Sequence, residues 1–275
     1  MQDTSALPPL PAGPNLMIGA IIPTYNHLSA LPRIVAALRN HGLPVIIVDD
    51  GNTGDAQLRL SDHDRPGEGV SVVRRMKNGG KGAAMKTGFA QAAQRGWTHA
   101  VQVDADGQHD LGALPQLLSL AGANPEAVVC AVPVYDSTIP LGRRIGREIT
   151  HLWVRIETLS FEITDSMCGF RIYPLGDTIA VIEREFLGNR MDFDTEILVQ
   201  LNWRGVRCAE CPVKVIYPEG NYSNFRMLRD NIRISAMHTR LAVQAPVRVV
   251  IREARRLWMR RYPKIARPPT KVHDA

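Results

Sequence analysis

The chain has 275 residues, of which 45% are hydrophobic and 22% are charged. This composition excludes an intrinsically disordered protein, and the length suits one large α/β domain with or without an appendage. No apolar run approaches the ~20 residues that span a bilayer, and the N-terminus lacks the basic and apolar regions of a secretory signal. We therefore expect a cytoplasmic protein. Its net charge of +6 is uneven, because residues 226–275 contain 13 Lys or Arg but only 3 Asp or Glu.

Apolar runs alternate with helical patterns along the chain. After a proline-rich flexible leader at 1–15, we predict strands at 17–22, 45–48, 70–73, 100–103 and 127–132, and helices at 29–39, 83–94 and 113–120. The second half predicts helices at 143–159 and 195–203, the latter closed by Gly205, a strand at 169–173 and an extended segment at 206–217. Such alternation is typical of a mainly parallel twisted sheet flanked by helices. We assign residues 16–240 to this folded domain and 241–275 to a basic tail.

The tail contains an amphipathic helical pattern. One face carries Val247, Val250, Ile251, Ala254 and Trp258, and the other is largely Arg248, Arg252, Arg255 and Arg256. A basic amphipathic helix with a Trp fits an anionic membrane surface, where it would lie without crossing the bilayer. The same pattern fits a helix that packs on its own domain. We expect no nucleic-acid partner, since no recognition motif accompanies the basic residues.

Acidic pairs follow two of the predicted strands. Asp49 and Asp50 come after 45–48, and Asp104 and Asp106 come after 100–103. Ligands of parallel α/β sheets bind outside the carboxyl ends of the strands, so both pairs are expected at one rim. Four carboxylates there repel one another unless a cation or hydrogen-bond donors compensate. The alternative is a set of solvated turn residues, because Asp-Gly is a common turn pair.

Two further patterns point to a phosphate ligand and a metal ion. Asp104 and Asp106, with Gln108 just beyond, provide oxygen ligands of the kind that Mg²⁺ or Mn²⁺ binds, with water and substrate phosphates completing the coordination. The segment 78–82 reads Asn-Gly-Gly-Lys-Gly and precedes a predicted helix. Its glycines allow close backbone approach, and a helix N-terminus favours an anion. The segment matches neither the P-loop nor the dinucleotide fingerprint, so a plain loop is the alternative.

The ordered set of motifs resembles glycosyltransferase family 2. Pro23-Thr24-Tyr25-Asn26, Val48-Asp49-Asp50-Gly51, the glycine-rich segment 78–82 and the segment 104–109 (Asp-Ala-Asp-Gly-Gln-His) follow one another as in that family. The segments 165–171 (Asp-Ser-Met-Cys-Gly-Phe-Arg) and 210–213 (Glu-Cys-Pro-Val) are similar to the dolichyl-phosphate mannose and glucose synthases. The resemblance extends from Met17 to about Arg226.

The resemblance implies a GT-A fold and a hexosyltransferase. Such an enzyme moves a sugar from a nucleotide-diphosphate donor to an acceptor, with inversion and with Mg²⁺ or Mn²⁺. The acceptor would be polyprenyl phosphate or another lipid-linked molecule, which places the protein at the inner face of the membrane. The motifs do not select among UDP, GDP and dTDP donors.

Site residues follow from the resemblance by position. The donor residues are Pro23, Tyr25, Asn26, Asp49, Asp50, Lys81 and Asp104, and the metal ligands are Asp104, Asp106 and Gln108. The acceptor or phosphate residues are Arg143, Arg144, Arg147, Arg171, Ser223 and Arg226. A phosphate acceptor, with a second pKa of about 6, needs no protein base, whereas a hydroxyl acceptor does. The candidate catalytic residues are Asp194, our first choice as that base, Asp165 and Glu196.

The chain also departs from the family pattern. His27 stands where Glu is usual, Asn52 replaces a common Ser, and Ser223 is followed by Asn where the synthases have an anion-binding Lys. Arg226 replaces that Lys only in part, because Arg and Lys are not equivalent.

Three other functions use similar residues. A nucleotidyltransferase would carry a glycine-rich basic loop after its first strand. A haloacid-dehalogenase-like phosphotransferase would carry Thr or Val in place of Gln108. A non-catalytic nucleotide-sugar-binding protein would have no need of the intact Asp104 and Asp106 pair.

Overall fold

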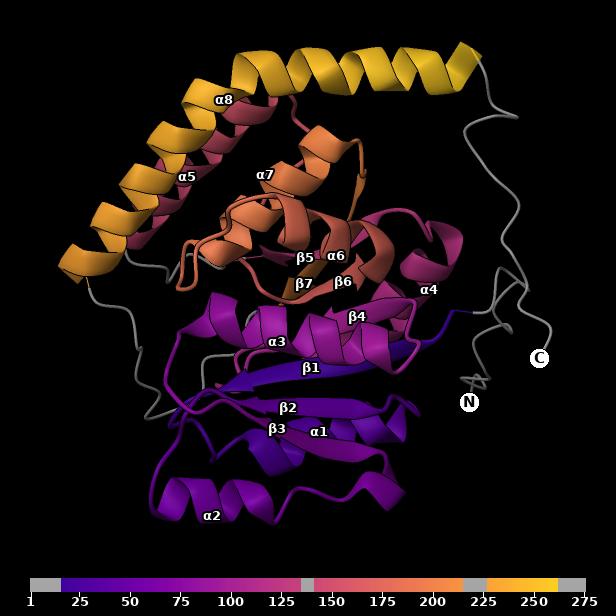
Figure 1. Cartoon of the computed structure of the whole chain (residues 1–275), viewed down its shortest axis with the longest axis vertical. Helices are drawn as coiled ribbons and strands as arrows, with labels where there is room; N and C mark the ends of the chain where they lie inside the picture. The colour runs from indigo at the N-terminus through magenta and orange to yellow at the C-terminus, as the bar shows by residue number, and fades with distance from the viewer. Residues whose placement is uncertain (1–15, 135–140, 215–226, 262–275) are drawn as a thin grey trace, which may run out of the picture.

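The computed structural model describes residues 16–134, 141–214 and 227–261, and its centre is one seven-stranded sheet (Figure 1). The strands lie in the order β3-β2-β1-β4-β6-β5-β7. Their bounds are β1 (Ile18–Thr24), β2 (Val45–Asp49), β3 (Val70–Arg74), β4 (His99–Gln102), β5 (Val128–Val134), β6 (Arg171–Pro174) and β7 (Cys208–Lys214).

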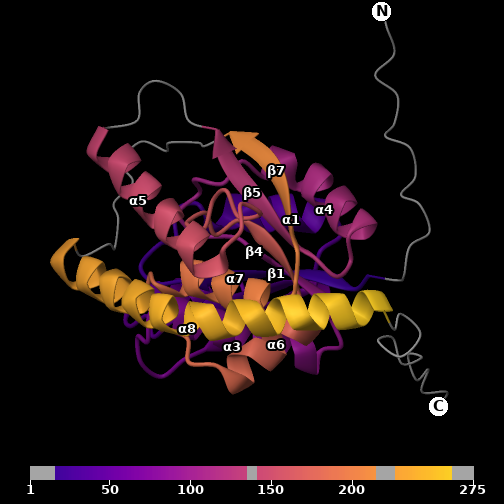
Figure 2. The same ribbon diagram turned by 90° about the horizontal axis from the view of Figure 1, so that it is seen from above.

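Helices cover both faces of the sheet. They are α1 (Leu31–Asn40), α2 (Asp55–Ser61), α3 (Lys81–Gln94), α4 (Leu114–Ala123), α5 (Leu141–Thr158), α6 (Leu175–Arg184), α7 (Phe193–Arg204) and α8 (Met227–Arg261), with short 3₁₀ turns at η1 (Pro66–Glu68) and η2 (Leu111–Ala113). Helices α3, α6 and α7 lie over one face, and α1 and α4 over the other (Figures 1 and 2). The predicted mainly parallel α/β sheet is confirmed.

Alternation along the central strands builds the two cores. On β1, Ile21 packs into the core beneath α3 and α7, whereas its neighbours Ala20 and Ile22 pack toward α1 and α4. Successive side chains of a strand point to opposite faces, so a strand covered on both sides is apolar throughout. This explains why the central strands appear in the sequence as continuous apolar runs.

Strand β6 is the exception to the parallel arrangement. It runs antiparallel to both β4 and β5, with Gln102 opposite Arg171. The first residue of β6 therefore lies beside the last residue of β4. This direction carries the loop before β6, with Asp165 and Ser166, to the carboxyl-end rim of the sheet.

The element bounds differ from the sequence predictions at several places. Helix α1 begins two residues later than predicted, with Ala30 at its N-cap and no side-chain cap. Helices α2 and α6 were not predicted, and α6 buries Leu175, Thr178 and Val181 at helical spacing after a proline. The predicted end of α7 is confirmed, because Gly205 adopts the left-handed conformation (φ 98°) that closes a helix.

Helix α8 contains the predicted amphipathic segment but is much longer. It bends part-way along (Figure 1), and Pro246 lies inside it, where its ring cannot donate the backbone hydrogen bond. The predicted boundary between residues 240 and 241 falls inside this helix. Leu241, Ala245 and Val249 are buried in the core that contains α7, so part of the tail packs on the domain. None of the helices in the described residues is both long and apolar enough to cross a membrane.

Arg252 holds α8 to the domain and provides a test of this packing. Its side chain is buried and donates to the Thr158 carbonyl at 2.7 Å and to the Asn202 side-chain carbonyl. Arg252→Met is expected to lower the free energy of unfolding by about 3 kcal/mol, because it leaves buried acceptors without a donor. Arg255→Met, at an exposed position of the same helix, is expected to change it by less than about 0.5 kcal/mol. Equal urea midpoints for the two variants would contradict the packing of α8.

Candidate active site

The carboxylate of Asp50 joins the glycine-rich loop to the strand rim. It is buried, and it accepts from Arg75 Nε at 2.9 Å and from the backbone N–H groups of Gly79 and Gly80 at 3.0 and 2.7 Å. The Arg75 guanidinium also donates to Thr87 Oγ1 at 2.6 Å. Hydrogen-bond donors thus compensate this carboxylate, as its position at an acidic rim requires.

Asp49 is held by a different partner. Its Oδ1 accepts from both the backbone and side-chain nitrogens of Asn52, each at 2.7 Å. Asn52 in turn donates to the Thr24 carbonyl at 3.2 Å and accepts from the Asn26 backbone N–H at 2.8 Å. The Asn that replaces the common Ser therefore links the ends of β1 and β2. Asp49 therefore serves this link, and Tyr25, which follows the end of β1, is exposed.

The second acidic pair follows β4. Asp104 is half-buried, and its Oδ2 lies 3.7 Å from His109 Nε2. The His109 ring stacks on Phe170 with centroids 5.2 Å apart. Burial lowers the pKa of His109 against the opposing effect of Asp104 and Asp106, which favours the neutral ring. Asp106 accepts from the Gln108 backbone N–H at 3.0 Å, which closes the turn.

This pair fits a partial metal site. Asp104 Oδ1 is buried and has no hydrogen-bond partner in the structure, which is a costly state for a carboxylate oxygen without a ligand. The described residues contain no group of three or more His, Cys, Asp or Glu side chains that could hold a metal ion. An ion at Asp104 and Asp106 would therefore take most of its ligands from water and substrate, which is the usual arrangement for Mg²⁺ beside phosphates.

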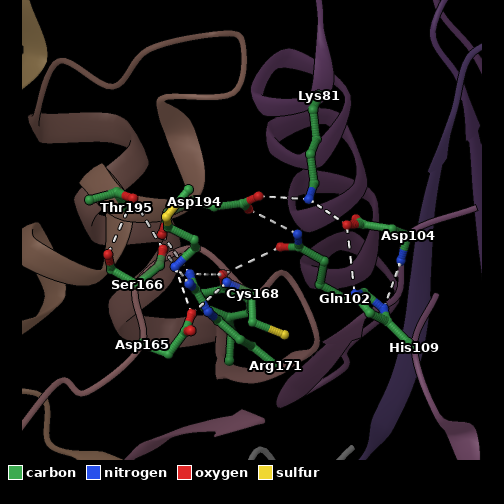
Figure 3. Close-up of polar contacts among 12 residues, drawn as sticks. Lys81, Gln102, Asp104, His109, Asp165, Ser166, Cys168, Arg171, Asp194 and Thr195 are labelled. Atoms are coloured by element: carbon green, nitrogen blue, oxygen red, sulfur yellow. Dashed lines mark hydrogen bonds and ion pairs between the residues drawn. The ribbon is translucent and has the colours of Figure 1, made fainter. Parts of the chain in front are cut away.

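Lys81 lies at the centre of the site (Figure 3). Its Nζ is 2.7 Å from Asp104 Oδ2 and 2.6 Å from Asp194 Oδ2. Burial acts to lower the pKa of Lys81, but the two carboxylates outweigh it and raise that pKa above its ordinary value. Gln102 Nε2 donates to the other Asp194 oxygen at 2.9 Å. Lys81 thus joins the glycine-rich loop to both halves of the chain.

Arg171 extends the network beneath the site. Its guanidinium is fully buried and donates to the Ser166 carbonyl at 2.7 Å, the Asp194 carbonyl at 2.5 Å and Tyr173 Oη at 3.2 Å. Tyr173 Oη donates to Gln102 Oε1 at 3.3 Å. Arg171 therefore positions the loop before β6 and the start of α7, and it has no surface that an acceptor could reach.

Asp165 is also occupied by the protein. It is buried, and its Oδ1 accepts from the backbone N–H groups of Met167 and Cys168, both at 2.8 Å. Its Oδ2 is paired with Arg147, and His151 Nε2 lies 3.8 Å away. These contacts hold the loop and tie it to α5.

Glu196 faces α8. It is fully buried, accepts from the Gly188 backbone N–H at 2.7 Å and is paired with Arg240. Burial raises the pKa of Glu196, against the opposing hydrogen bonds. Of the three predicted catalytic residues, Asp194 contacts Lys81 and through it is linked to Asp104, whereas Asp165 and Glu196 are held elsewhere.

The predicted donor residues meet at one rim, which is built from the ends of β1, β2 and β4 and the start of α3; they are Pro23, Tyr25, Asn26, Asp49, Asp50, Lys81 and Asp104. The residues predicted to bind the acceptor or its phosphate are not brought together in the same way. Arg147 is half-buried against Asp165, and Arg171 is internal. The side chains of Arg143 and Arg144, and all of Ser223 and Arg226, lie outside the described residues.

The sequence predictions missed three site residues. Arg75 neutralises Asp50, while Gln102 and Tyr173 orient Asp194. Gln102 left a signal, since it is a polar residue at the end of an otherwise apolar strand. Arg75 lies two residues after the predicted strand at 70–73, where a cation opposite two acids is informative.

A family model described as "Glycosyl transferase family 2" matches residues 20–189 of the chain. The chain belongs to this family. The chain is also similar to two named relatives over most of its length. It is 30% identical over 210 residues to an undecaprenyl-phosphate mannosyltransferase of Micrococcus luteus, covering 72% of this chain and 83% of that protein. It is 30% identical over 226 residues to a polyprenol monophosphomannose synthase of Mycolicibacterium smegmatis, covering 78% and 82%.

A solved structure supports the fold of this family 2 member. Glucosyl-3-phosphoglycerate synthase from Mycobacterium tuberculosis superposes with a TM-score of 0.59 at 16% identity, covering 86% of this chain and 80% of that one. That enzyme was solved in complex with Mn²⁺, UDP and glucosyl-3-phosphoglycerate. The predicted GT-A fold is confirmed by this similarity.

The contacts of Asp165 predict a structural role that stability measurements can test. Asp165→Ala removes the acceptor of two backbone N–H groups and the partner of Arg147, so we expect a loss of about 3 kcal/mol in the free energy of unfolding. Asp177→Ala breaks a half-exposed pair with Arg204 and is expected to cost less than about 1 kcal/mol. An Asp165 variant with unchanged stability and abolished activity would instead support the catalytic role.

Proposed function

We propose that the protein transfers a hexose from a nucleotide-diphosphate donor to a polyprenyl phosphate or similar lipid-linked phosphate. The observation that carries this proposal is the rim itself. Asp104 presents an unpartnered buried oxygen there, beside a lysine at the start of α3 and the glycine-rich loop. Membership of the family and relatives that use polyprenyl-phosphate acceptors support it.

The metal would be held by Asp104, Asp106 and Gln108. A bound Mg²⁺ or Mn²⁺ would act as a Lewis acid on the leaving diphosphate. The Mn²⁺ and UDP bound by the structurally similar synthase support a divalent ion in the same fold. The backbone N–H groups of Gly79 and Gly80 donate to Asp50 and hold the glycine-rich loop in place. The donor diphosphate would then approach the N-terminus of α3, which favours an anion.

The state of Asp194 favours a phosphate acceptor over a hydroxyl. Its two oxygens are already engaged, Oδ2 by the Lys81 ammonium and Oδ1 by the Gln102 amide, so neither is directed at an acceptor hydroxyl. A phosphate is already largely ionised at neutral pH and attacks without a base. Direct displacement by this phosphate inverts the anomeric carbon. Asp194 then serves to orient Lys81.

A lipid acceptor requires access to a membrane, and exposed apolar side chains support it. Helix α8 presents Val247, Val250, Ile251, Leu257 and Trp258, and the neighbouring α5 presents Ile145, Ile149, Leu152, Trp153 and Ile156. We propose that this surface docks on an anionic bilayer. The 13 Lys or Arg after residue 225 supply the attraction, at about 1 kcal/mol for each that approaches the headgroups. The protein would thus be peripheral at the inner face of the membrane.

Sugar transfer is expected to depend on the rim acids and on a divalent ion. Asp104→Ala and Asp106→Ala should each lower kcat by about a hundredfold or more, because charge on the leaving diphosphate loses its counter-ion. Asp106→Ala should leave the melting temperature near that of the wild type, whereas Asp104→Ala should lower it, because it also removes the partner of Lys81. The measurement is transfer from radiolabelled UDP- and GDP-hexoses to undecaprenyl phosphate with Mn²⁺. Full activity of both variants, or of the wild type in excess EDTA, would contradict the metal assignment.

Vesicle binding is expected to depend on the exposed face of α8. The double variant Val247→Asp with Val250→Asp should reduce cosedimentation with phosphatidylglycerol vesicles at low salt by about tenfold or more, since burying each Val contributes about 1.5 kcal/mol or more. The double variant Met17→Asp with Leu58→Asp adds the same charge at exposed apolar positions elsewhere and should retain most binding. An equal loss of vesicle binding in both double variants would show that the added negative charge, and not the exposed face of α8, accounts for the loss.

A further inference from the structure

The ammonium of Lys81 lies between two carboxylates of the acidic rim, where a metal ion could otherwise bind. It lies 2.7 Å from Asp104 Oδ2 and 2.6 Å from Asp194 Oδ2, on a side chain that is 14% exposed. We propose that Lys81 keeps divalent metal off Asp104 in the free protein and releases that carboxylate when a nucleoside diphosphate binds. The proposal rests on the proposed function, because it concerns the order in which that site is filled.

Competition follows from the shared carboxyl group. The ammonium is bound to one oxygen of Asp104, and the metal would bind the other, Oδ1, only one carbon away. A divalent ion and an ammonium at such separation repel strongly in a partly buried site. The described residues offer no third acidic, His or Cys ligand to offset this repulsion. The free protein should therefore bind the metal weakly.

A nucleoside diphosphate removes both obstacles. Its oxygens add ligands to the metal and negative charge beside the ammonium. Lys81 is the first residue of α3, directly after Gly79 and Gly80, where a helix N-terminus already favours an anion. An ammonium has three N–H donors on a flexible stem, so Lys81 can keep Asp194 and turn from Asp104 to the diphosphate. Metal and donor are thus bound together.

The test is a titration of the intact protein with Mn²⁺, followed by the electron paramagnetic resonance signal of the free ion. Without nucleotide, Lys81→Gln is expected to bind Mn²⁺ at least about tenfold more tightly than the wild type, because the competing charge is gone. Lys77→Gln, which removes the same charge at an exposed position of the preceding loop, should behave as the wild type. Lys81→Arg, which keeps a cation, should also bind weakly.

Nucleotide supplies the second arm. Saturating UDP or GDP is expected to tighten Mn²⁺ binding to the wild type by at least about tenfold, and to narrow the gap to Lys81→Gln. Equal affinity of wild type and Lys81→Gln for Mn²⁺ alone, or no binding by that variant, would overturn the proposal. The proposal would also be overturned if the wild-type protein bound Mn²⁺ equally tightly with and without nucleotide. This comparison does not depend on the folding of any variant. Failure of the nucleotides to bind at all would refute the proposed function. The Mn²⁺ affinities of the wild type and Lys81→Gln without nucleotide would still test whether Lys81 competes with the metal.

Discussion

The ion pairs of Lys81 with Asp104 and Asp194 are the interaction on which the site depends. Buried carboxylates that face one another need a compensating charge, and here one ammonium serves two of them. The two acids come from the end of β4 and the start of α7, about ninety residues apart in the chain. The pair therefore does more than neutralise charge, because it links the second half of the domain to the half that contains the glycine-rich loop.

Close backbone approach makes this geometry attainable. A Cβ on Gly169 would lie 2.7 Å from Lys81 Nζ and 2.6 Å from Gln102 Nε2, so a side chain there would displace the ends of both side chains from the network. Gly80 has φ 98°, a conformation that side chains rarely adopt, and a Cβ there would lie 2.6 Å from the Asn189 carbonyl. The guanidinium of Arg171 donates hydrogen bonds to the carbonyls of Ser166 and Asp194, which would otherwise be buried without donors.

Helix α8 has both a face that packs on the domain and an apolar surface that is exposed. Leu241, Ala245 and Val249 pack into the core, and Arg252 donates to buried acceptors. Val247 and Val250, on other sides of the same turns, are 65% and 67% exposed. A helix that is apolar on its packed face and again on part of its outer face leaves surface that a monomeric soluble domain rarely exposes. Through Arg240 and Glu196, the same helix also contacts the start of α7, next to Asp194.

The sequence by itself determined the family, the alternating strands and helices, and the acids at the strand ends. These features are local, since a strand covered on both faces must be apolar throughout and a ligand rim must follow the strand. Asp49, Asp50, Asp104 and Lys81 therefore lie together at the strand-end rim, as the sequence predicted.

The tertiary structure decided which charges are available. Asp165, Glu196 and Arg171 have the right chemistry for a site, yet their partners lie on other elements and direct them inward. Arg75 and Gln102 gained their roles in the same way, from contacts across the fold. Sequence spacing specifies where a side chain starts, whereas burial and charge pairing between distant elements decide where it points.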